Sequence, residues 1–270
     1  MTKSNRLQEI LNWKKEELAD AKRRMPMSGL IPRAEEFAKL RKNERPFRKA
    51  ISKIGNGIHI IAEIKRASPS KGLIRSDFSV PLWAKTYESA GASAISVLTE
   101  KKFFQGSLDD LATVKKSVEI PVLRKDFILD TYQLYETAAW NADAVLLIAR
   151  ILSESELADL IALADELSLD VLVETHDEAD MEKALSTGAT IIGINNRDLT
   201  TFTISLETTL RLAGYLDPKL HIGVSESGIH KREDIEKITT GTGIRCFLVG
   251  ESIMKSEDPG QMIKHLRGID

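Results

Sequence analysis

The sequence has one cysteine, no long apolar segment and no signal peptide. Cys246 cannot form a disulfide within the chain, so the sequence is unlike that of a small secreted protein stabilised by disulfides. No apolar run approaches the roughly 20 residues that a membrane-spanning helix requires. The opening segment 1–24 is charged and lacks the apolar middle of a signal peptide. We therefore expect a cytoplasmic protein in which Cys246 is a buried thiol and not a nucleophile.

An excess of charge and metal-binding motifs are also absent. The 38 basic and 40 acidic side chains give a net charge of −2, so no positive field attracts nucleic acid or an acidic membrane. The five histidines show no His-Glu-x-x-His or other metal-ligand spacing. We expect no nucleic-acid partner, no membrane partner and no metal.

From residue 58 onward the sequence alternates regularly between two patterns. Short apolar runs rich in β-branched residues are followed by amphipathic helical segments, which indicates parallel strands joined by helices. The apolar runs lie at 58–64, 92–99, 120–126, 143–149, 170–175, 190–196, 221–227 and 244–251, and the helical segments at 81–90, 107–117, 131–140, 153–167, 177–187, 205–213, 231–239 and 259–267. Eight such units in about 210 residues predict a (β/α)8 TIM barrel. The competing fold, an open doubly wound sheet, favours a Gly-x-Gly-x-x-Gly turn that this sequence lacks.

Residues 1–57 precede the first predicted strand and have a helical pattern. Two or three helices are expected, within 6–24, 32–42 and 45–52, with turns at Pro26, Gly29, Pro32 and Pro46. We interpret this segment as an N-terminal helical extension packed on a single catalytic domain at 58–270.

In a (β/α)8 barrel the active site lies at the carboxyl ends of the strands and in the loops that follow. In this sequence those ends carry charged or amide side chains, whereas the other half of each strand is apolar. Glu63 and Lys65 share the face of Ile61, because side chains alternate along a strand. The other polar strand ends are Lys125 and Asp126, Glu174, Asn195 to Arg197, Ser225 to Gly228, and Gly250 and Glu251. One polar strand end is ordinary, but this many together predict a site.

Glu63, Lys125 and Glu174 suit acid–base chemistry. A lysine ammonium near two carboxylates keeps its proton and delivers it to a carbonyl oxygen as that oxygen gains negative charge. Lys65 suits the binding of an anionic group. The alternative is a structural ion pair between Glu63 and Lys65, but such buried pairs are costly to desolvate and are seldom favoured for stability alone.

The loops after the seventh and eighth strands form the usual phosphate site of this fold. They read SESGIHKREDI and LVGESIMKSEDP. Gly228 and Gly250 allow an anion to approach the backbone, and Ser227 adds a hydroxyl. Two ordinary strand-to-helix turns are the alternative. Glycine in both loops favours a small, phosphorylated substrate.

Taken together, the motifs resemble the indole-3-glycerol phosphate synthase family of tryptophan biosynthesis. The resemblance rests on IAEIKRASPSKG, SVLTEKKFFQGS, PVLRKDFILD, LVETHDEADMEKAL, GINNRDLTTF, VSESGI and FLVGESIM, in this order along the chain. The RPFRKAI segment before the first strand is also similar to the helical extension of that family. The resemblance implies closure of an indole ring with loss of carbon dioxide and water from 1-(2-carboxyphenylamino)-1-deoxyribulose 5-phosphate.

The resemblance also implies roles for individual residues. Lys125 would be the general acid, Glu174 and Glu63 would assist proton removal and dehydration, and Lys65 would hold an anion and share in later proton transfers. The other implied substrate contacts are Asn195, Arg197, Glu226 and Ser68 for polar groups, Ser227, Gly228, Gly250, Glu251 and Lys65 for phosphate, and Phe104, Phe127, Leu146, Leu199 and Leu248 for the anthranilate ring. The loop 66–80 would be a lid. The chemistry requires no cofactor, because the ring-closed intermediate accepts the electrons released with carbon dioxide.

Two other functions agree less well with the sequence. A phosphoribosylanthranilate isomerase would need a cysteine–aspartate pair, and the only cysteine lies inside the eighth predicted strand. A binding protein that had lost its chemistry would have lost catalytic positions, yet Lys125, Glu63 and Glu174 are all present. We expect a monomer, with a homodimer as the alternative.

Overall fold

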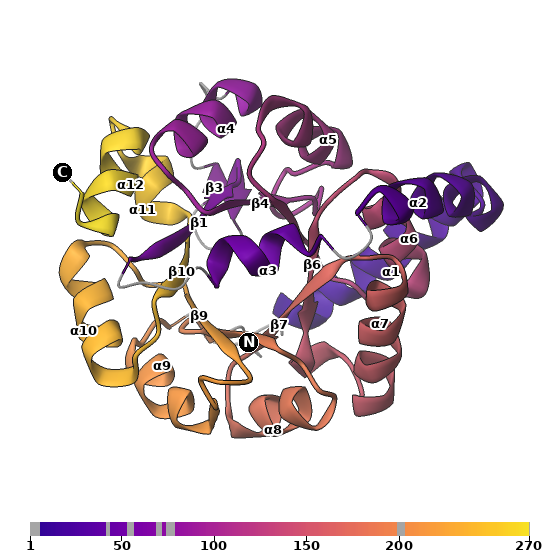
Figure 1. Ribbon diagram of the computed structural model, residues 1–270. Coiled ribbons are helices and arrows are strands. Elements are labelled where there is room, and N and C mark those ends of the chain that lie inside the picture. The colour runs from indigo at the N-terminus through magenta and orange to yellow at the C-terminus, as the bar shows by residue number, and fades with distance from the viewer. Residues whose placement is uncertain are drawn as a thin grey trace, which may run out of the picture.

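The structure is a computed structural model that describes residues 6–41, 44–52, 57–68, 72–73, 79–198 and 203–269. Eight parallel strands form a closed barrel (Figure 1) in which β1 pairs with both β10 and β4. The strands are β1 (His59–Ile64), β4 (Ala94–Leu98), β5 (Val122–Lys125), β6 (Ala144–Ile148), β7 (Asp170–Thr175), β8 (Ile191–Asn195), β9 (Ile222–Glu226) and β10 (Cys246–Val249). The predicted (β/α)8 barrel is therefore confirmed.

Helices surround the barrel and lie where the amphipathic segments predicted them. They are α4 (Val80–Ser89), α5 (Leu108–Ser117), α6 (Thr131–Ala139), α7 (Glu154–Glu166), α8 (Glu178–Ser186), α9 (Glu207–Leu212), α10 (Arg232–Thr242) and α12 (Pro259–Arg267). Several begin at a capping side chain, as at Ser107, Asp130, Ser153 and Asp177, whose oxygens accept from backbone N–H groups of the first turn.

Five short elements were not predicted. They are the antiparallel two-residue strands β2 (Ala67–Ser68) and β3 (Gly72–Leu73), the 3₁₀ turns η1 (Ala149–Ile151) and η2 (Ala213–Tyr215), and helix α11 (Glu251–Lys255). The last corrects the predicted end of the eighth strand, because β10 stops at Val249 and Gly250 is the N-cap of α11. Elements this short have too few residues to show a period in the sequence.

The N-terminal extension forms α1 (Arg6–Arg24), α2 (Met27–Arg41) and α3 (Pro46–Ile51). The turns predicted at Gly29 and Pro32 were wrong, because both residues lie inside α2. Proline inside a helix loses one backbone hydrogen bond. Here α2 packs along α6 and buries Leu30 and Ala34 completely or nearly so, and that burial offsets the local cost.

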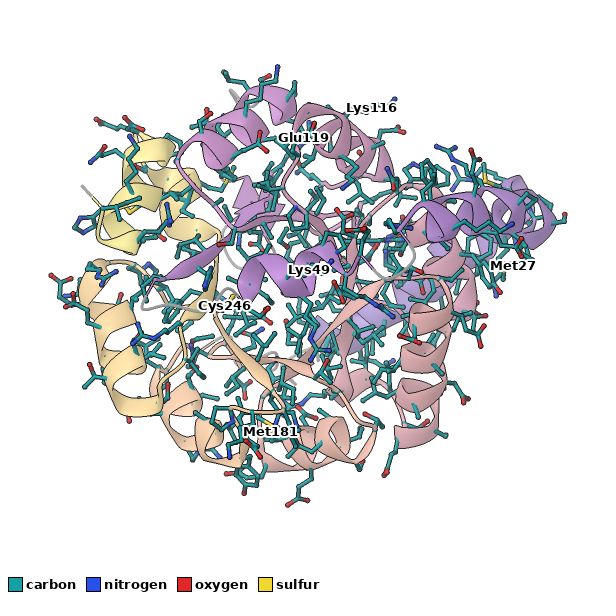
Figure 2. The ribbon with its side chains drawn as sticks, in the orientation of Figure 1. Met27, Lys49, Lys116, Glu119, Met181 and Cys246 are labelled. Carbon is teal, nitrogen blue, oxygen red and sulfur yellow. The ribbon has the colours of Figure 1, made fainter. Side chains whose placement is uncertain are left out.

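The extension reaches both ends of the barrel. Phe47 and Ile51 of α3 join the apolar interior of the barrel at the amino ends of the strands, where Figure 1 shows α3 crossing the opening. Ile10 of α1 joins the same interior cluster. Figure 2 shows Lys49 on α3 and Cys246 at the start of β10, where the thiol is 2% exposed and burial raises its pKa.

Candidate active site

A lysine and two glutamates meet at the carboxyl ends of three strands. Lys125 Nζ of β5 donates hydrogen bonds to Glu174 Oε2 of β7 and to Glu226 Oε2 of β9, both at 3.0 Å. The side chain of Lys125 is 16% exposed, and those of the two glutamates are 3% and 1% exposed. The predicted site residues Lys125, Glu174 and Glu226 are therefore in direct contact.

Glu63 of β1 completes a layer of four charged side chains. In barrels of this fold, four side chains from alternate strands fill one interior layer. Here β1, β5, β7 and β9 are alternate strands of the barrel, and each contributes one charged residue at its carboxyl end. Glu63 forms an ion pair with Lys65, the contact that the sequence analysis gave as the alternative, and both residues also line the cavity. A layer that usually packs with branched apolar side chains is thus polar in this protein.

The charges in this layer set one another's protonation. Burial alone would lower the pKa of Lys125, but the attraction of Glu174, Glu226 and Glu63 outweighs it and raises that pKa. Burial would raise the pKa of Glu174, yet Lys125, His176 and a hydrogen bond from Asn195 lower it to about 2. Burial and the neighbouring Glu174 raise the pKa of Glu226 to about 8 despite Lys125. The two glutamates therefore differ in acidity, with Glu174 the more acidic of the pair and Glu226 the one that more readily takes up a proton.

Two glycines make room for the carboxylates. A Cβ atom at Gly193 of β8 would lie 2.0 Å from Glu226 Oε1, and one at Gly250 would lie 2.3 Å from Glu63 Oε1. Neither glycine has a positive φ angle, so the reason for glycine is space and not backbone conformation. The sequence suggested a phosphate role for Gly250, and the structure adds this packing role.

Asn195 and Arg197 follow β8 at the rim of the cavity. Asn195 donates to Glu174, and its Oδ1 accepts from the backbone N–H of Arg197 at 3.0 Å. The guanidinium of Arg197 lies 3.5 Å from Glu251 Oε2, and Lys255 binds the other oxygen of Glu251 at 2.7 Å. The carboxylate of Glu251 is therefore neutralised on both sides by cations.

The loop after β9 turns sharply beside the same cavity. Ser227 and Gly228 have φ angles of 64° and 80°, in the left-handed region. Both line the cavity together with His230, Arg197 and Gly250. The two loops predicted to bind phosphate thus lie on one side of one cavity.

Apolar side chains also line the cavity. The rings of Phe104 and Phe127 are tilted with their centroids 6.4 Å apart, and Leu146 and Leu248 line the cavity with them. The sequence prediction missed six further apolar lining residues and His230; the apolar ones are Leu7 and Ile10 of α1, Leu98, Ile148, Ile229 and Val249. A signal was available for α1, where residues 7, 10, 11 and 14 follow helical spacing on one face.

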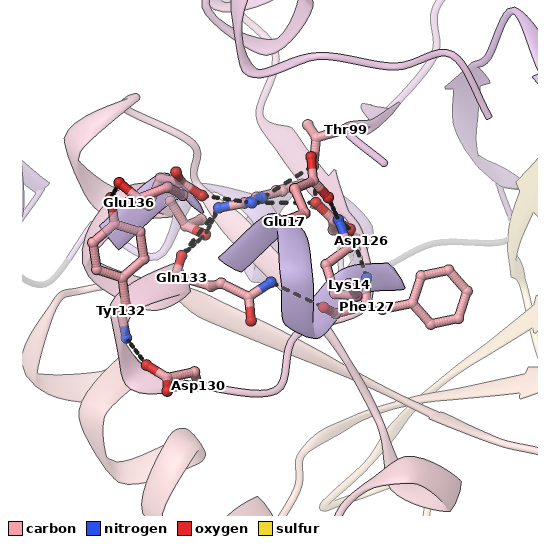
Figure 3. Close-up of polar contacts among 12 residues, drawn as sticks. Lys14, Glu17, Thr99, Asp126, Phe127, Asp130, Tyr132, Gln133 and Glu136 are labelled. Atoms are coloured by element: carbon pink, nitrogen blue, oxygen red, sulfur yellow. Dashed lines mark hydrogen bonds and ion pairs between the residues drawn. The ribbon is translucent and has the colours of Figure 1, made fainter. Parts of the chain in front are cut away.

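The outer side of β5 carries a buried polar network (Figure 3). Lys14 of α1 lies 2.7 Å from Asp126 Oδ1 and 2.6 Å from Glu17, while Arg124 binds Glu136 at 2.8 Å and Asp126 Oδ2 at 3.2 Å. Asp126 was predicted as a polar strand end near the site. Asp126 does line the cavity, and its carboxylate also joins α1 to the strand that holds Lys125.

Some predicted positions lie away from the cavity or outside the described residues. Asn196 and Ser225 hydrogen-bond each other and Thr209 of α9, away from the interior layer. Leu199 lies outside the described residues, as do 69–71 and 74–78 of the predicted lid and the side chain of Ser68.

No metal or membrane feature was found in the part of the chain that is described. Within those residues, no group of three or more histidine, cysteine, aspartate or glutamate side chains is arranged to hold a metal ion. None of the described helices is both long enough and apolar enough to cross a membrane.

Comparisons with known proteins agree on one family. The family model described as indole-3-glycerol phosphate synthase matches residues 7–266. A protein of that name from Desulfosudis oleivorans is 47% identical over 262 residues, 96% of this chain and 97% of the relative. Another from Caldanaerobacter subterraneus is 46% identical over 264 residues, 97% of this chain and 99% of the relative. Among solved structures, 3-hexulose-6-phosphate synthase from Salmonella typhimurium superposes with a TM-score of 0.64 at 12% identity, covering 78% of this chain and 98% of that one, a likeness of fold alone.

Proposed function

The chain belongs to the indole-3-glycerol phosphate synthase family, the carboxy-lyases of tryptophan biosynthesis, and we propose that it acts on 1-(2-carboxyphenylamino)-1-deoxyribulose 5-phosphate. The products are indole-3-glycerol phosphate, carbon dioxide and water. The observation that carries the proposal is Lys125, held between Glu174 and Glu226 in a cavity with an apolar wall and a glycine-containing rim.

Lys125 is the general acid of ring closure. The aromatic carbon that bears the carboxylate attacks the ribulose carbonyl carbon, and the carbonyl oxygen gains negative charge as the new carbon–carbon bond forms. The proton of Lys125 passes to that oxygen, because an alkoxide is a stronger base than a lysine amine. The attraction of three carboxylates keeps Lys125 charged until then.

Loss of carbon dioxide restores the aromatic ring without a cofactor. Ring closure leaves an electron-poor ring, which takes up the electron pair of the breaking carbon–carboxylate bond. The protein supplies position, protons and exclusion of water for this step. The apolar lining formed by Phe104, Phe127, Leu146 and Leu248 binds the anthranilate ring. We propose that Leu199 contacts the same ring.

Dehydration then requires one acid and one base. The hydroxyl leaves as water after accepting a proton, and a second proton is removed from the new five-membered ring. Glu174, which is ionised, and Glu63 are placed to accept protons. Lys65 holds the anionic end of the substrate and shares in these transfers. Glu226 Oε1, which has no hydrogen-bond partner among the described residues, orients a substrate hydroxyl together with Asn195 and Arg197.

The phosphate group binds at the rim formed by Ser227, Gly228 and Gly250. At Glu251 the backbone and not the carboxylate is the group that faces phosphate, because the carboxylate already binds Arg197 and Lys255 and would repel an anion. We further propose that Ser68 contacts the substrate and that the loop 66–80 acts as a lid over the cavity.

We also propose a monomer that works in the cytoplasm, with residues 1–57 as an extension of the catalytic domain 58–270. The contacts of the three helices support treating residues 1–57 as part of the catalytic domain. Helix α1 lines the cavity, α2 packs on α6, and α3 joins the barrel interior. The isomerase alternative gains no support, since Cys246 does not line the cavity.

Turnover of the proposed substrate, followed by indole fluorescence, tests the function. Lys125→Ala should lower kcat by about 10²–10⁴-fold, the usual contribution of a general acid, while substrate still binds. Lys116→Ala is the matched control, because Lys116 is an exposed lysine on α5 (Figure 2). No turnover by the unmodified chain would refute the function, and full turnover by Lys125→Ala would refute the assigned acid.

A further inference from the structure

His176 is a buried titratable residue that the proposed mechanism does not use. It follows β7 directly, and its side chain is 3% exposed. Neither ring nitrogen makes a hydrogen bond of ordinary geometry with the described residues. Buried polar atoms without partners are rare in folded proteins, so this ring requires an explanation.

The ring lies between two carboxylates. Nε2 is 3.4 Å from Glu174 Oε1, and Nδ1 is 3.4 Å from Asp180 Oδ2 on α8. An ionised carboxylate only accepts hydrogen bonds, and a neutral imidazole has one donor and one acceptor nitrogen. A neutral ring would therefore point a lone pair at one of the two anions. Only the doubly protonated ring offers a donor to each.

Charges on the neighbouring elements agree with a cation at this position. Arg150 of η1 lies 3.1 Å from Asp180 Oδ2 and also pairs with Asp177, so Asp180 stays ionised between Arg150 and His176. On the other side, Lys125 binds Oε2 of Glu174 and also contacts Glu226. His176 thus faces the one oxygen of Glu174 that Lys125 leaves open.

We propose that His176 is a positioning residue that holds Glu174 from behind by donating from both ring nitrogens, to Glu174 on one side and to Asp180, which Arg150 braces, on the other. The proposal rests on the catalytic role proposed above for Glu174. With Lys125 on one oxygen and His176 on the other, the carboxylate plane of Glu174 is fixed. Glu174 also keeps a cationic partner at the moment when Lys125 gives its proton to the substrate.

Nitrogen-15 NMR of the histidine-labelled full chain tests the protonation state without any activity measurement. Across the neutral pH range, both ring nitrogens of His176 should show the shifts of protonated nitrogens. In Glu174→Gln the ring loses one anionic acceptor, so the chemical shift of Nε2 should change, and this change also identifies the signals of His176. A neutral ring in the unmodified chain would overturn the proposal, whether or not the chain turns over the proposed substrate.

Kinetics of His176→Gln test the positioning role. Glutamine removes the charge and leaves the cavity intact, because His176 does not line it. We expect kcat to fall roughly ten- to a hundredfold, as for misplacement of a reacting group by about 1 Å, with KM within about twofold. His221→Gln is the control, since His221 precedes β9 at the opposite end of the barrel. An unchanged kcat in His176→Gln would refute the role.

Discussion

Asp126→Asn removes the central charge of the network behind β5 and tests how α1 is held. Asp126 accepts four hydrogen bonds, from Lys14 and the Phe127 N–H at Oδ1 and from Thr99 and Arg124 at Oδ2. An asparagine replaces one oxygen by an NH2 group, so two of these donors must face a donor whichever way the amide lies.

The expected loss of stability is about 3–5 kcal/mol, the usual result of breaking a buried charge pair from one side. The pKa of Asp126 gives a lower bound for this loss of stability. Burial would raise it, but Lys14 and Arg124 lower it from 3.8 to about 2. That difference corresponds to about 2 kcal/mol, since a tenfold change is about 1.4 kcal/mol. A loss of 3–5 kcal/mol lowers Tm by about 6–15 °C in a chain of this size.

The pH dependence follows from the sign of the same difference. Because folding lowers the pKa of Asp126, its contribution is complete above about pH 4 and is lost as the pH falls towards about 2. The stability difference between the unmodified chain and Asp126→Asn should therefore narrow in that window. Urea unfolding followed by circular dichroism measures it, with Asp159→Asn on the exposed side of α7 as control. A loss below about 1 kcal/mol at neutral pH would show that these charges do not hold α1 to β5.

Three other predictions concern the cavity. Folding raises the pKa of Glu226, so the stability of the unmodified chain should fall as the pH rises from about 5 to about 8, whereas the stability of Glu226→Gln should not show this loss. The free energies of unfolding of both proteins, measured at both pH values, check this. Gly193→Ala and Gly250→Ala should each lower kcat about tenfold or more by displacing Glu226 or Glu63, whereas Gly57→Ala, with open space around it, should not; equal rates in all three would contradict the packing argument. Lys14→Met should raise KM more than it lowers kcat, because α1 lines the cavity with Leu7 and Ile10; initial rates over a range of substrate concentrations decide it.

The barrel and its polar interior layer could be predicted because both follow from regular repeats in the sequence, namely the repeat of strand and helix segments and the alternation of side chains along each strand. Alternating apolar runs and helical segments marked the eight units, and the same alternation placed Glu63 and Lys65 on one face of β1. Once the fold was known, the strand ends Lys125, Glu174 and Glu226 had to converge. These features need only local sequence and the geometry of a closed sheet.

The remaining features depend on contacts between distant segments. Pro32 looked like a turn because its neighbours in sequence do not reveal that α2 packs on α6. Asp126 was predicted at the site and lines the cavity, but nothing nearby in sequence shows that Lys14 also approaches it from α1. His176 has no metal or catalytic spacing, and its importance appears only when Glu174 and Asp180 lie on either side of its ring.

The link between Lys14 and Asp126 also has a consequence for protein synthesis. The two residues are about 110 positions apart, and Tyr132 of α6 likewise binds the backbone of Ala21 in α1. At roughly 5–20 residues per second, about 5–20 s pass between translation of α1 and translation of the strand and helix that receive it. During that interval Lys14 has no buried carboxylate to meet, and Leu7 and Ile10 have no cavity to line. Helix α1, although it leaves the ribosome before β5 and α6, is therefore among the later parts of the active site to reach its place.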